Sequence, residues 1–384
     1  MNKRFEELDI LRGLSVIGMI LVIVPGAWDQ RFTWLNHADW RGFSFADMIF
    51  PTFLFCVGFS IVLSINNRIA NKQNVFKHIL VRSILLISLG LIMSLIPDFD
   101  FKNFRIPGIL QRIGFCYLLV GSLITYSFPM NTEGNAIIKK QIKVLLICIG
   151  LISAFYWIIL NFIPVPKLNM TGYDSEKSWP AFIDRSIFGV NHLWVYGQTK
   201  GVVTYDPEGL LSTIPSCINV IAGAIMGLLY RGKNKLFNLK YLFTIGFILI
   251  LLGWSFDKTG IDLMIKKIWT ISFAILSSGF SIVLFAFIIL TGRTVISKIY
   301  FPAKVFGANT LLGFIIGILS GLLIDRPIIK INNEYKSLRD SGFAFFKQIF
   351  DNPQYASFAF SITFLIISFL FLYILYRRKW YIKL

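Results

Sequence analysis

The feature that most constrains this chain is a series of apolar runs, each long enough to cross a lipid bilayer. A helix that spans roughly 30 Å of hydrocarbon needs about 20 apolar residues. Such runs occupy residues 8–24, 46–65, 79–96, 108–128, 142–163, 209–229, 241–256, 268–290, 302–324 and 357–376. They are continuous, whereas a membrane β-barrel would alternate apolar and polar residues. The sequence therefore predicts an all-α integral membrane protein, a polytopic bundle of about ten transmembrane helices.

Composition favours lipid over water as the surroundings of most side chains. Of the 384 residues, 55% are hydrophobic and 15% are charged, while average soluble domains carry about 25% charged residues. Asp9 and Arg12 lie in the first run, and no small-residue cleavage site follows it, so we expect this run not to be a cleaved signal peptide. We expect a single transmembrane domain over residues 1–384, with a long ordered outer loop at 164–208 as its substrate-side insertion.

The positive charge of the chain lies in the short loops between the apolar runs. The net charge is +18, but Lys and Arg do not gather in one basic arm or stripe, so we exclude a nucleic-acid partner. With the N-terminus inside, the predicted cytoplasmic loops and tail hold Arg68, Lys72, Lys77, Lys139, Lys140, Lys143, Arg231, Lys233, Lys235, Lys240, Arg377, Arg378, Lys379 and Lys383. Cytoplasmic loops are enriched in such cations. The pattern predicts cytoplasmic N- and C-termini, although the loop at 257–267 does not contribute to it.

The four cysteines all lie inside apolar runs, at positions 56, 116, 148 and 217. They form no Cys-x-x-Cys pair. Because a buried cysteine usually behaves as a small hydrophobic residue, we expect neither a disulfide nor a metal site.

Three arginines in or beside apolar runs are singled out, because ionisable groups inside spans are functional candidates by default. Arg12 either binds a ligand, reaches the cytoplasmic interface or pairs with Asp9. Arg105 and Arg112 lie two helical turns apart at the outer start of the fourth run, with Gln111 beside Arg112. Guanidinium groups suit phosphates and carboxylates. Arg105 also fits an interface anchor, whereas Arg112 lies deeper in the run.

The segment between the first two runs places His37 ten residues before Asp47, which opens the second predicted helix. If the intervening loop folds back, the carboxylate can hold the imidazole in one tautomer and raise its basicity. Trp40 lies in the same segment, but Trp is enriched at bilayer interfaces whatever the function. One His–Asp spacing is a weak signal, so it marks His37 as a candidate catalytic residue and no more.

The long loop at 164–208 combines aromatic residues with carboxylates and amides. Loops of this length are usually functional or disordered, and the aromatic content argues for order. Ring faces suit the apolar C–H patches of a sugar, and carboxylates suit its hydroxyls and amines. The loop therefore predicts a sugar site, with packing on the rim of the bundle as the alternative. Its candidate residues are Asp184, His192, Asp206 and Glu208.

A set of short motifs lies in order along nearly the whole chain. The set comprises LDILRG (8–13), HADW (37–40) with Gly42, ADMIFPTFLFCVG (46–58), RIPGILQRIG (105–114), Ile183-Asp184-Arg185, His192-Leu193, YDPEGLL (205–211) and Gly307-Ala308-Asn309. Together these motifs resemble the heparan-α-glucosaminide N-acetyltransferase family, including its small bacterial members, within the transmembrane acyltransferase group. The chain departs from the family at Val24-Pro25-Gly26, which lacks the Asn that many members carry before Pro-Gly.

The resemblance implies an acetyl-CoA donor and an amino-sugar acceptor, with the acetyl group crossing a membrane. A bacterial inner membrane would then hold the protein. The catalytic histidine of the family falls on His37 and the following aspartate on Asp47. Asn309 would donate a hydrogen bond to the oxyanion or, alternatively, join two helices. The candidates for donor binding are Arg12, Arg105, Gln111 and Arg112, and those for the acceptor are Trp40, Asp184, His192, Asp206 and Glu208.

Several alternatives stay open from the sequence. His37 acts either as a general base or as a nucleophile that is itself acetylated. The acceptor group is an amine or, in O-acetylation of a cell-envelope polysaccharide, a hydroxyl. A sugar transporter is the rival from another class, although the sequence shows no convincing internal repeat of the kind that transporters have. A homodimer is compatible with the sequence.

Overall fold

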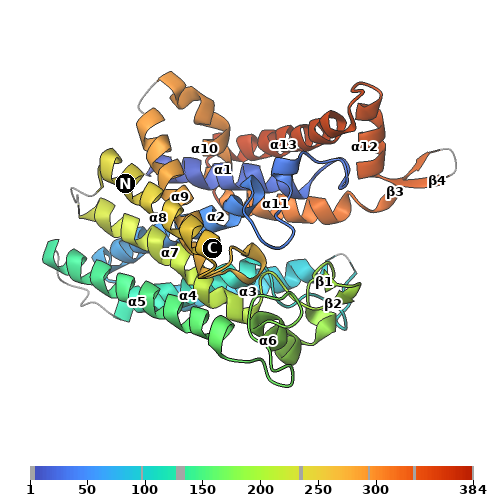
Figure 1. The fold of residues 1–384 in the computed structure, drawn as a ribbon. Helices are drawn as coiled ribbons and strands as arrows, with labels where there is room; N and C mark the ends of the chain where they lie inside the picture. The colour runs from blue at the N-terminus through green and yellow to red at the C-terminus, as the bar shows by residue number, and fades with distance from the viewer. Residues whose placement is uncertain are drawn as a thin grey trace. The chain divides into compact units, whose positions relative to one another are not determined.

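The computed structural model describes residues 5–96, 98–126, 135–232, 237–292, 295–331 and 334–382. Within them, eight helices are long and apolar enough to cross a membrane. They are α2 (Phe45–Ala70), α3 (Val75–Leu95), α4 (Ile109–Tyr126), α5 (Asn135–Phe162), α7 (Leu210–Arg231), α8 (Leu239–Thr259), α9 (Ile271–Thr291) and α13 (Pro353–Arg377) (Figure 1). The predicted all-α polytopic membrane protein is confirmed. Lys233, Lys235 and Lys383 of the predicted cytoplasmic cations lie outside the described residues.

The first apolar run differs from the others in its charge. It forms helix α1 (Glu6–Ile23), whose first turns hold Glu7, Asp9 and Arg12 as well as Glu6. This charge keeps α1 out of the eight spans, although its helical extent agrees with the predicted run.

The run at 302–324 is a broken helix. It consists of α10 (Phe301–Ala308) and α11 (Thr310–Leu323), which meet at Asn309 with a bend of 81°. If this bent pair counts as one span, the described chain has nine, against the predicted number of about ten. The polar residue at the break interrupts a run that hydropathy alone presents as continuous.

The backbone divides into two compact units. The first unit comprises Met1–Ala38, Ser44–Phe50 and Phe287–Lys383. The second unit comprises Asp39–Phe43 and Pro51–Ala286. The described chain therefore changes unit twice within the polar segment that precedes α2, once inside α2 and once inside α9.

In the first unit, α1 packs closely against α10. Glycines make this approach possible, because a Cβ on Gly13 would lie 1.8 Å from the carbonyl oxygen of Ala303. A Cβ on Gly307 would likewise lie 1.8 Å from the carbonyl oxygen of Asp9. Small residues commonly serve such backbone contacts between membrane helices. The unit also contains the antiparallel strands β3 (Pro327–Ile331) and β4 (Glu334–Ser337) and the helix α12 (Leu338–Lys347).

In the second unit, α7 is the central helix, and it contacts α4, α5 and α6 (Figure 1). The part of α2 beyond Pro51 also touches it, since a Cβ on Gly58 would lie 1.8 Å from the carbonyl oxygen of Val220. A Cβ on Gly223 would lie 1.9 Å from the carbonyl oxygen of Phe55. The central position explains why nearly every residue of α7 is buried.

The segment 164–208 is ordered, as its composition predicts. It forms helix α6 (Trp179–Phe188), a 3₁₀ turn at Val190–His192, and a hairpin of β1 (Gln198–Thr199) and β2 (Val202–Val203). A Pro in the first turn of α6 suits a helix start, because its missing N–H is one that the helix leaves unused there. The segment is followed by Gly209, the residue directly before α7.

Candidate active site

The first unit brings His37 and Asp47 together. His37 Nδ1 lies 2.8 Å from Asp47 Oδ1. An ionised carboxylate can only accept, so Nδ1 carries the proton and donates it to this bond. The basic nitrogen of the ring is then Nε2. The Asp47 side chain is 1% exposed and the His37 side chain is 39% exposed, which leaves the imidazole the more accessible partner.

The Asp47 carboxylate is fixed by the start of α2. Its Oδ2 accepts hydrogen bonds from Ser44 N and Ser44 Oγ, both at 3.0 Å, and from Ala38 N at 3.2 Å. Ser44 and Asp47 have the spacing of a capping box, in which the third helical residue reaches back to the capping residue. The positive end of the helix dipole also favours a carboxylate there. A local helix start thus orients the partner of His37.

Residues 39–43, between His37 and Asp47 in the sequence, are bonded within the second unit. Arg41 Nε donates to Asp257 Oδ1 at 2.9 Å, and Arg41 Nη2 donates to the Asp257 carbonyl at 2.9 Å. Gly42 N donates to the Met264 carbonyl at 2.8 Å, with a φ of 130° that favours glycine. Trp40 Nε1 donates to the Tyr173 carbonyl at 2.8 Å. Successive residues of this short segment are therefore held in place, and the indole N–H of Trp40 is used in doing so.

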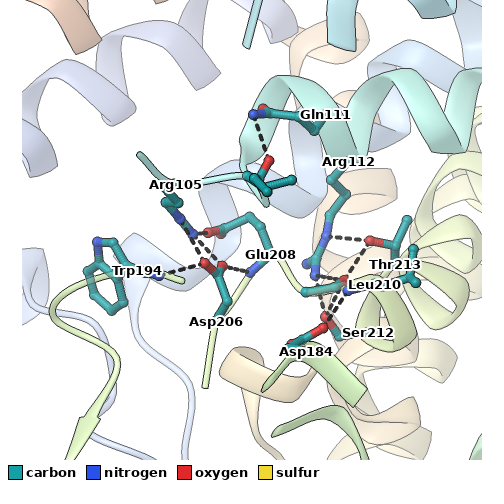
Figure 2. A network of polar contacts seen from close by, with 12 residues as sticks. Arg105, Gln111, Arg112, Asp184, Trp194, Asp206, Glu208, Leu210, Ser212 and Thr213 are labelled. Carbon is teal, nitrogen blue, oxygen red and sulfur yellow. Dashed lines mark hydrogen bonds and ion pairs between the residues drawn. The ribbon is translucent and has the colours of Figure 1, made fainter. Parts of the chain in front are cut away.

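Arg105 forms an ion-pair cluster with two carboxylates in the second unit (Figure 2). Arg105 Nε donates to Asp206 Oδ2 at 2.8 Å, and Nη2 donates to Asp206 Oδ1 and Glu208 Oε2. Burial by itself would lower the pKa of Arg105, but the charges of Asp206 and Glu208 outweigh it and raise that pKa. Trp194 N also donates to Asp206 Oδ2 at 2.8 Å. The guanidinium of Arg105 is therefore neutralised by the protein itself.

His192 and Gln111 hold the backbone near Arg105. His192 Nδ1 lies 2.8 Å from the Phe104 carbonyl, to which it donates, and the His192 carbonyl accepts from Ile106 N at 2.9 Å. Gln111 Nε2 donates to the Ile106 carbonyl at 3.0 Å. Both side chains thus tie residues 104–106 to other parts of the second unit.

Arg112 belongs to α4, and its side chain reaches the first turn of α7, so its surroundings differ from those of Arg105 (Figure 2). Its Nε donates to Thr213 Oγ1 at 3.3 Å, and its Nη2 donates to the Gly209 carbonyl at 3.3 Å and to Ser212 Oγ. The guanidinium lies 4.8 Å from the centroid of the Trp269 ring. Arg112 is buried, its Nη1 has no hydrogen-bond partner, and no carboxylate in the described part of the chain forms an ion pair with it. Arg112 is therefore a held and desolvated cation without a contact ion pair among the described residues, although the more distant carboxylates of Glu208, Asp206 and Asp184 act on it electrostatically.

Asp184 supports the same turn of α7. Its Oδ1 accepts from Leu210 N at 2.9 Å, and its carboxylate lies so close to Gly209 that a Cβ there would be 1.8 Å from Oδ2. A side chain at position 209 would displace the Asp184 carboxylate. Burial raises the pKa of Asp184 to about 7, although the bond from Leu210 lowers it. The Oδ2 atom has no hydrogen-bond partner among the described residues.

Arg12 and Asn309 lie in the first unit and make structural contacts there. Arg12 Nη1 donates to Asp9 Oδ1 at 2.7 Å, which is the pairing that the sequence offered as an alternative. Asn309 Nδ2 donates to the Trp380 carbonyl at 3.0 Å, and Asn309 Oδ1 accepts from Ile382 N at 3.0 Å. Both ends of the Asn309 amide are thus used to hold the C-terminal segment.

Comparison with known proteins adds an independent observation. Residues 4–146 match the family model described as heparan-alpha-glucosaminide N-acetyltransferase, catalytic. The resemblance predicted from the motifs is confirmed. Heparan-alpha-glucosaminide N-acetyltransferase of Homo sapiens is 27% identical over 360 residues, covering 81% of this chain and 52% of the human protein. The Mus musculus protein of the same name is 26% identical over 354 residues, covering 81% of this chain and 53% of the mouse protein.

The chain spans about half the length of these two N-acetyltransferase relatives. The family match includes both partners of the His37–Asp47 pair and both arginines that precede or open α4. Asp184, His192 and Asp206 lie beyond the matched residues.

The sequence did not identify some of the residues around the His37–Asp47 pair and around Arg112. Ser44 holds the Asp47 carboxylate, and the Ser-x-x-Asp spacing of a capping box could have identified it. Ser212, Thr213 and Trp269 hold Arg112. The two hydroxyls are polar residues within an apolar run, which is a usable signal, but nothing in the sequence connects Trp269 with Arg112.

Proposed function

We propose that this protein is a transmembrane acetyltransferase that moves the acetyl group of acetyl-CoA to the amine of a glucosamine-type sugar. The observation that carries the proposal is the His37–Asp47 pair, in which the carboxylate accepts from Nδ1 at 2.8 Å. This tautomer makes Nε2 the base. The names of the human and mouse relatives supply the reaction class and the class of acceptor.

In the proposed reaction, His37 Nε2 takes a proton from the attacking amine. The amine nitrogen forms a bond to the acetyl carbon, the carbon–sulfur bond of the thioester breaks, and the proton returns from His37 to the departing thiolate. Asp47 stabilises the imidazolium that forms between these steps. Because three hydrogen bonds fix Asp47 Oδ2, the carboxylate needs little rearrangement during the cycle.

We assign donor binding chiefly to Arg112. A buried cation without a counter-ion is costly, and an anionic ligand would relieve that cost. Coenzyme A carries several phosphate charges, which guanidinium groups bind well. Arg105 is a weaker candidate, because Asp206 and Glu208 already neutralise it. Arg12, in the first unit, is a further candidate for donor binding.

For the acceptor we retain Trp40 and Glu208 as contact residues. Three other candidates are hydrogen-bonded to the backbone: Asp184 and Asp206 accept from N–H groups, and His192 donates to a carbonyl. We therefore assign them to positioning the segments that carry the contact residues. The Arg105 cluster has two carboxylates for one guanidinium, and this excess of negative charge suits the ammonium group of an amino sugar.

We also propose an orientation, with both termini in the cytoplasm of a bacterial inner membrane. The support is the excess of Lys and Arg in the short loops assigned to that side. Acetyl-CoA would then enter from the cytoplasm, while His37 and the segment 164–208 would face the other side. A Cys in place of Asn36 should react with an impermeant thiol reagent added to intact cells. Labelling that requires permeabilised cells would invert the orientation.

The test of the function uses purified protein, acetyl-CoA and a panel of amino sugars and their hydroxyl analogues, with products identified by mass spectrometry. We expect acetylated amine. Loss of a general base lowers the rate by about 10²–10⁴-fold, so His37→Ala should lose activity to this extent while His78→Ala, a matched change elsewhere in the chain, keeps it. Acetylated hydroxyl groups would indicate O-acetylation, and failure to bind acetyl-CoA would favour a transporter.

Residues His37 and Asp47 should act as one unit. We expect Asp47→Asn to lower the rate less than His37→Ala, and the double variant to be no slower than His37→Ala, because effects within a catalytic unit are not additive. Losses that multiply would separate the two residues. Trapping of an acetylated His37 in rapidly quenched samples would replace the direct transfer with a two-step route.

A further inference from the structure

The first unit holds a set of aromatic rings on the same two segments that carry His37 and Asp47. Trp34 lies in a 3₁₀ turn (Thr33–Leu35), and its ring meets the ring of Phe45 edge-on with centroids 5.5 Å apart. The His37–Asp47 contact joins the same loop to the same first turn of α2. The Trp34–Phe45 and His37–Asp47 contacts therefore both join the loop that precedes α2 to the first turn of α2.

The position of Trp34 is fixed from several directions. The next residue, Leu35, is buried in a core cluster with Val22 and Ala46, which anchors the turn. The Trp34 ring is stacked on Phe32 at 6.2 Å with an interplanar angle of 17°. Phe358 meets it edge-on, with centroids 6.1 Å apart. Such contacts limit the rotation of the indole, so that it is held rather than mobile.

Despite these contacts, Trp34 is 44% exposed and Phe45 is 41% exposed. An aromatic ring that is held by its neighbours and is still 44% exposed leaves ring surface available to pack on a flat apolar partner. The C–H face of a pyranose ring is such a surface, and the faces of aromatic rings carry partial negative charge that attracts C–H hydrogens.

Trp28 in the same loop offers a contrast. It is 49% exposed, but the guanidinium groups of Arg31 and Arg339 each lie 5.0 Å from its ring centroid. Two cations already occupy the space over this indole. Trp28 and Trp34 thus lie in the same loop and are similarly exposed. Of the two, only Trp34 is held by other aromatic rings and lies close in sequence to His37.

We propose that Trp34, together with Phe45, forms a platform that stacks on the sugar ring of the acceptor and directs its amine toward His37. This inference rests on the proposed acetyl transfer to an amino sugar and adds the residues that select a ring. Trp34 touches the acceptor in this arrangement, whereas His37 handles the proton. The bilayer interface is the competing environment for an exposed Trp.

The experiment compares Trp34→Ala, Trp34→Phe and the matched control Trp28→Ala in purified protein. We expect Trp34→Ala to raise the KM for glucosamine by about 10-fold, which corresponds to a lost ring contact of about 1.4 kcal/mol. Trp34→Phe should retain most of the affinity, and Trp28→Ala should leave this KM unchanged. The KM for acetyl-CoA should not change in any variant. Ethanolamine, an amine without a ring, should be used equally well or equally poorly by Trp34→Ala and the wild type.

Two results would overturn the platform. One is an unchanged KM for glucosamine in Trp34→Ala. The other is a set of parallel changes in thermal stability for Trp34→Ala and Trp28→Ala, with equal effects on every substrate, which would identify both residues as interface anchors.

Binding of glucosamine without acetyl-CoA, followed by saturation-transfer NMR, separates this inference from the proposed function. If the wild type binds the sugar through Trp34 but transfers no acetyl group, the platform stands and the function fails. If transfer occurs and sugar binding does not depend on Trp34, the function stands and the platform is wrong.

Discussion

Arg105 and Arg112 lie seven positions apart in the second unit, yet the groups around their guanidinium charges differ. Arg105 is 25% exposed and has two carboxylate partners. Arg112 is buried, with hydroxyl, carbonyl and indole partners but no carboxylate in the described chain. A neutralised arginine near the surface stabilises a fold. An uncompensated arginine in the interior is expected where a ligand supplies the missing charge.

The largest expected effect is a difference in stability between Arg105→Met and Arg112→Met. Arg105→Met leaves Asp206 and Glu208 without their cation, so we expect a loss on the order of 3–5 kcal/mol in the free energy of unfolding. Arg112→Met removes a buried charge, and Ser212 Oγ and Thr213 Oγ1 can still donate to the Gly209 carbonyl. Its free energy of unfolding without ligand should therefore be unchanged or higher. Denaturant unfolding in detergent measures both, and equal losses would remove the distinction between the two arginines.

The next effect is a pH dependence that originates at Asp184. Its pKa is raised to about 7 in the folded protein, so the folded state holds a proton that the unfolded state has released above about pH 4. The stability linked to this group is present at low pH and is lost as the pH rises through 7. Between pH 5 and pH 8 we expect a decrease of about 3 kcal/mol in the free energy of unfolding.

Asp184→Asn should remove most of that pH dependence, because an amide keeps the acceptor for Leu210 N without titrating. Unfolding of the wild type and the variant at the two pH values gives the difference directly. If the stability difference between the wild type and the variant is the same at pH 5 and at pH 8, Asp184 is ionised at both. Its carboxylate would then partly neutralise Arg112.

Donor binding tests the same comparison through ligand stabilisation. Acetyl-CoA at about 100 times its Kd should stabilise the wild type by about 2.7 kcal/mol. Arg112→Met should lose most of this shift at the same concentration, while binding of the sugar acceptor is retained. The thermal midpoint with and without acetyl-CoA is the measurement, with coenzyme-free samples of each variant as controls. A full shift in Arg112→Met would make Arg112 a structural residue.

The smallest effect concerns the second carboxylate of the Arg105 cluster. Glu208→Gln keeps Asp206 as the main partner of Arg105, so we expect a stability loss of only about 1 kcal/mol. If Glu208 contacts the acceptor, the KM for glucosamine should rise while that for acetyl-CoA stays the same. A loss as large as that of Arg105→Met would show that both carboxylates are needed to neutralise the guanidinium.

The sequence predicted the helices well because their signal is local. Each of the ten apolar runs coincides with a helix or, at 302–324, with a pair of helices, since a span requires only enough consecutive apolar residues. The break at Asn309 was not predicted. Its amide is satisfied by Trp380 and Ile382, and contacts of this range leave no periodic pattern near residue 309.

The candidate site was predictable where its contacts are short in sequence. His37 and Asp47 are ten residues apart, and the capping box from Ser44 to Asp47 explains how the loop returns to the helix start. The sequence predicted anion binding for both Arg105 and Arg112 from residue type and separated them only by depth, with an interface anchor as the alternative for Arg105. The sequence also left three alternatives open for Arg12 and two for Asn309, and the structure shows a contact for each side chain.

What the sequence determined by itself was the class of protein, the helices and the chemical groups near the start of α2 and α4, because hydropathy and capping act over a few residues. Only the tertiary structure decided which arginine is neutralised. Arg105 meets Asp206 across 101 positions, and Arg112 meets Ser212 across 100. The charge of a guanidinium is fixed by its residue type, but its free energy depends on which groups the fold places around it.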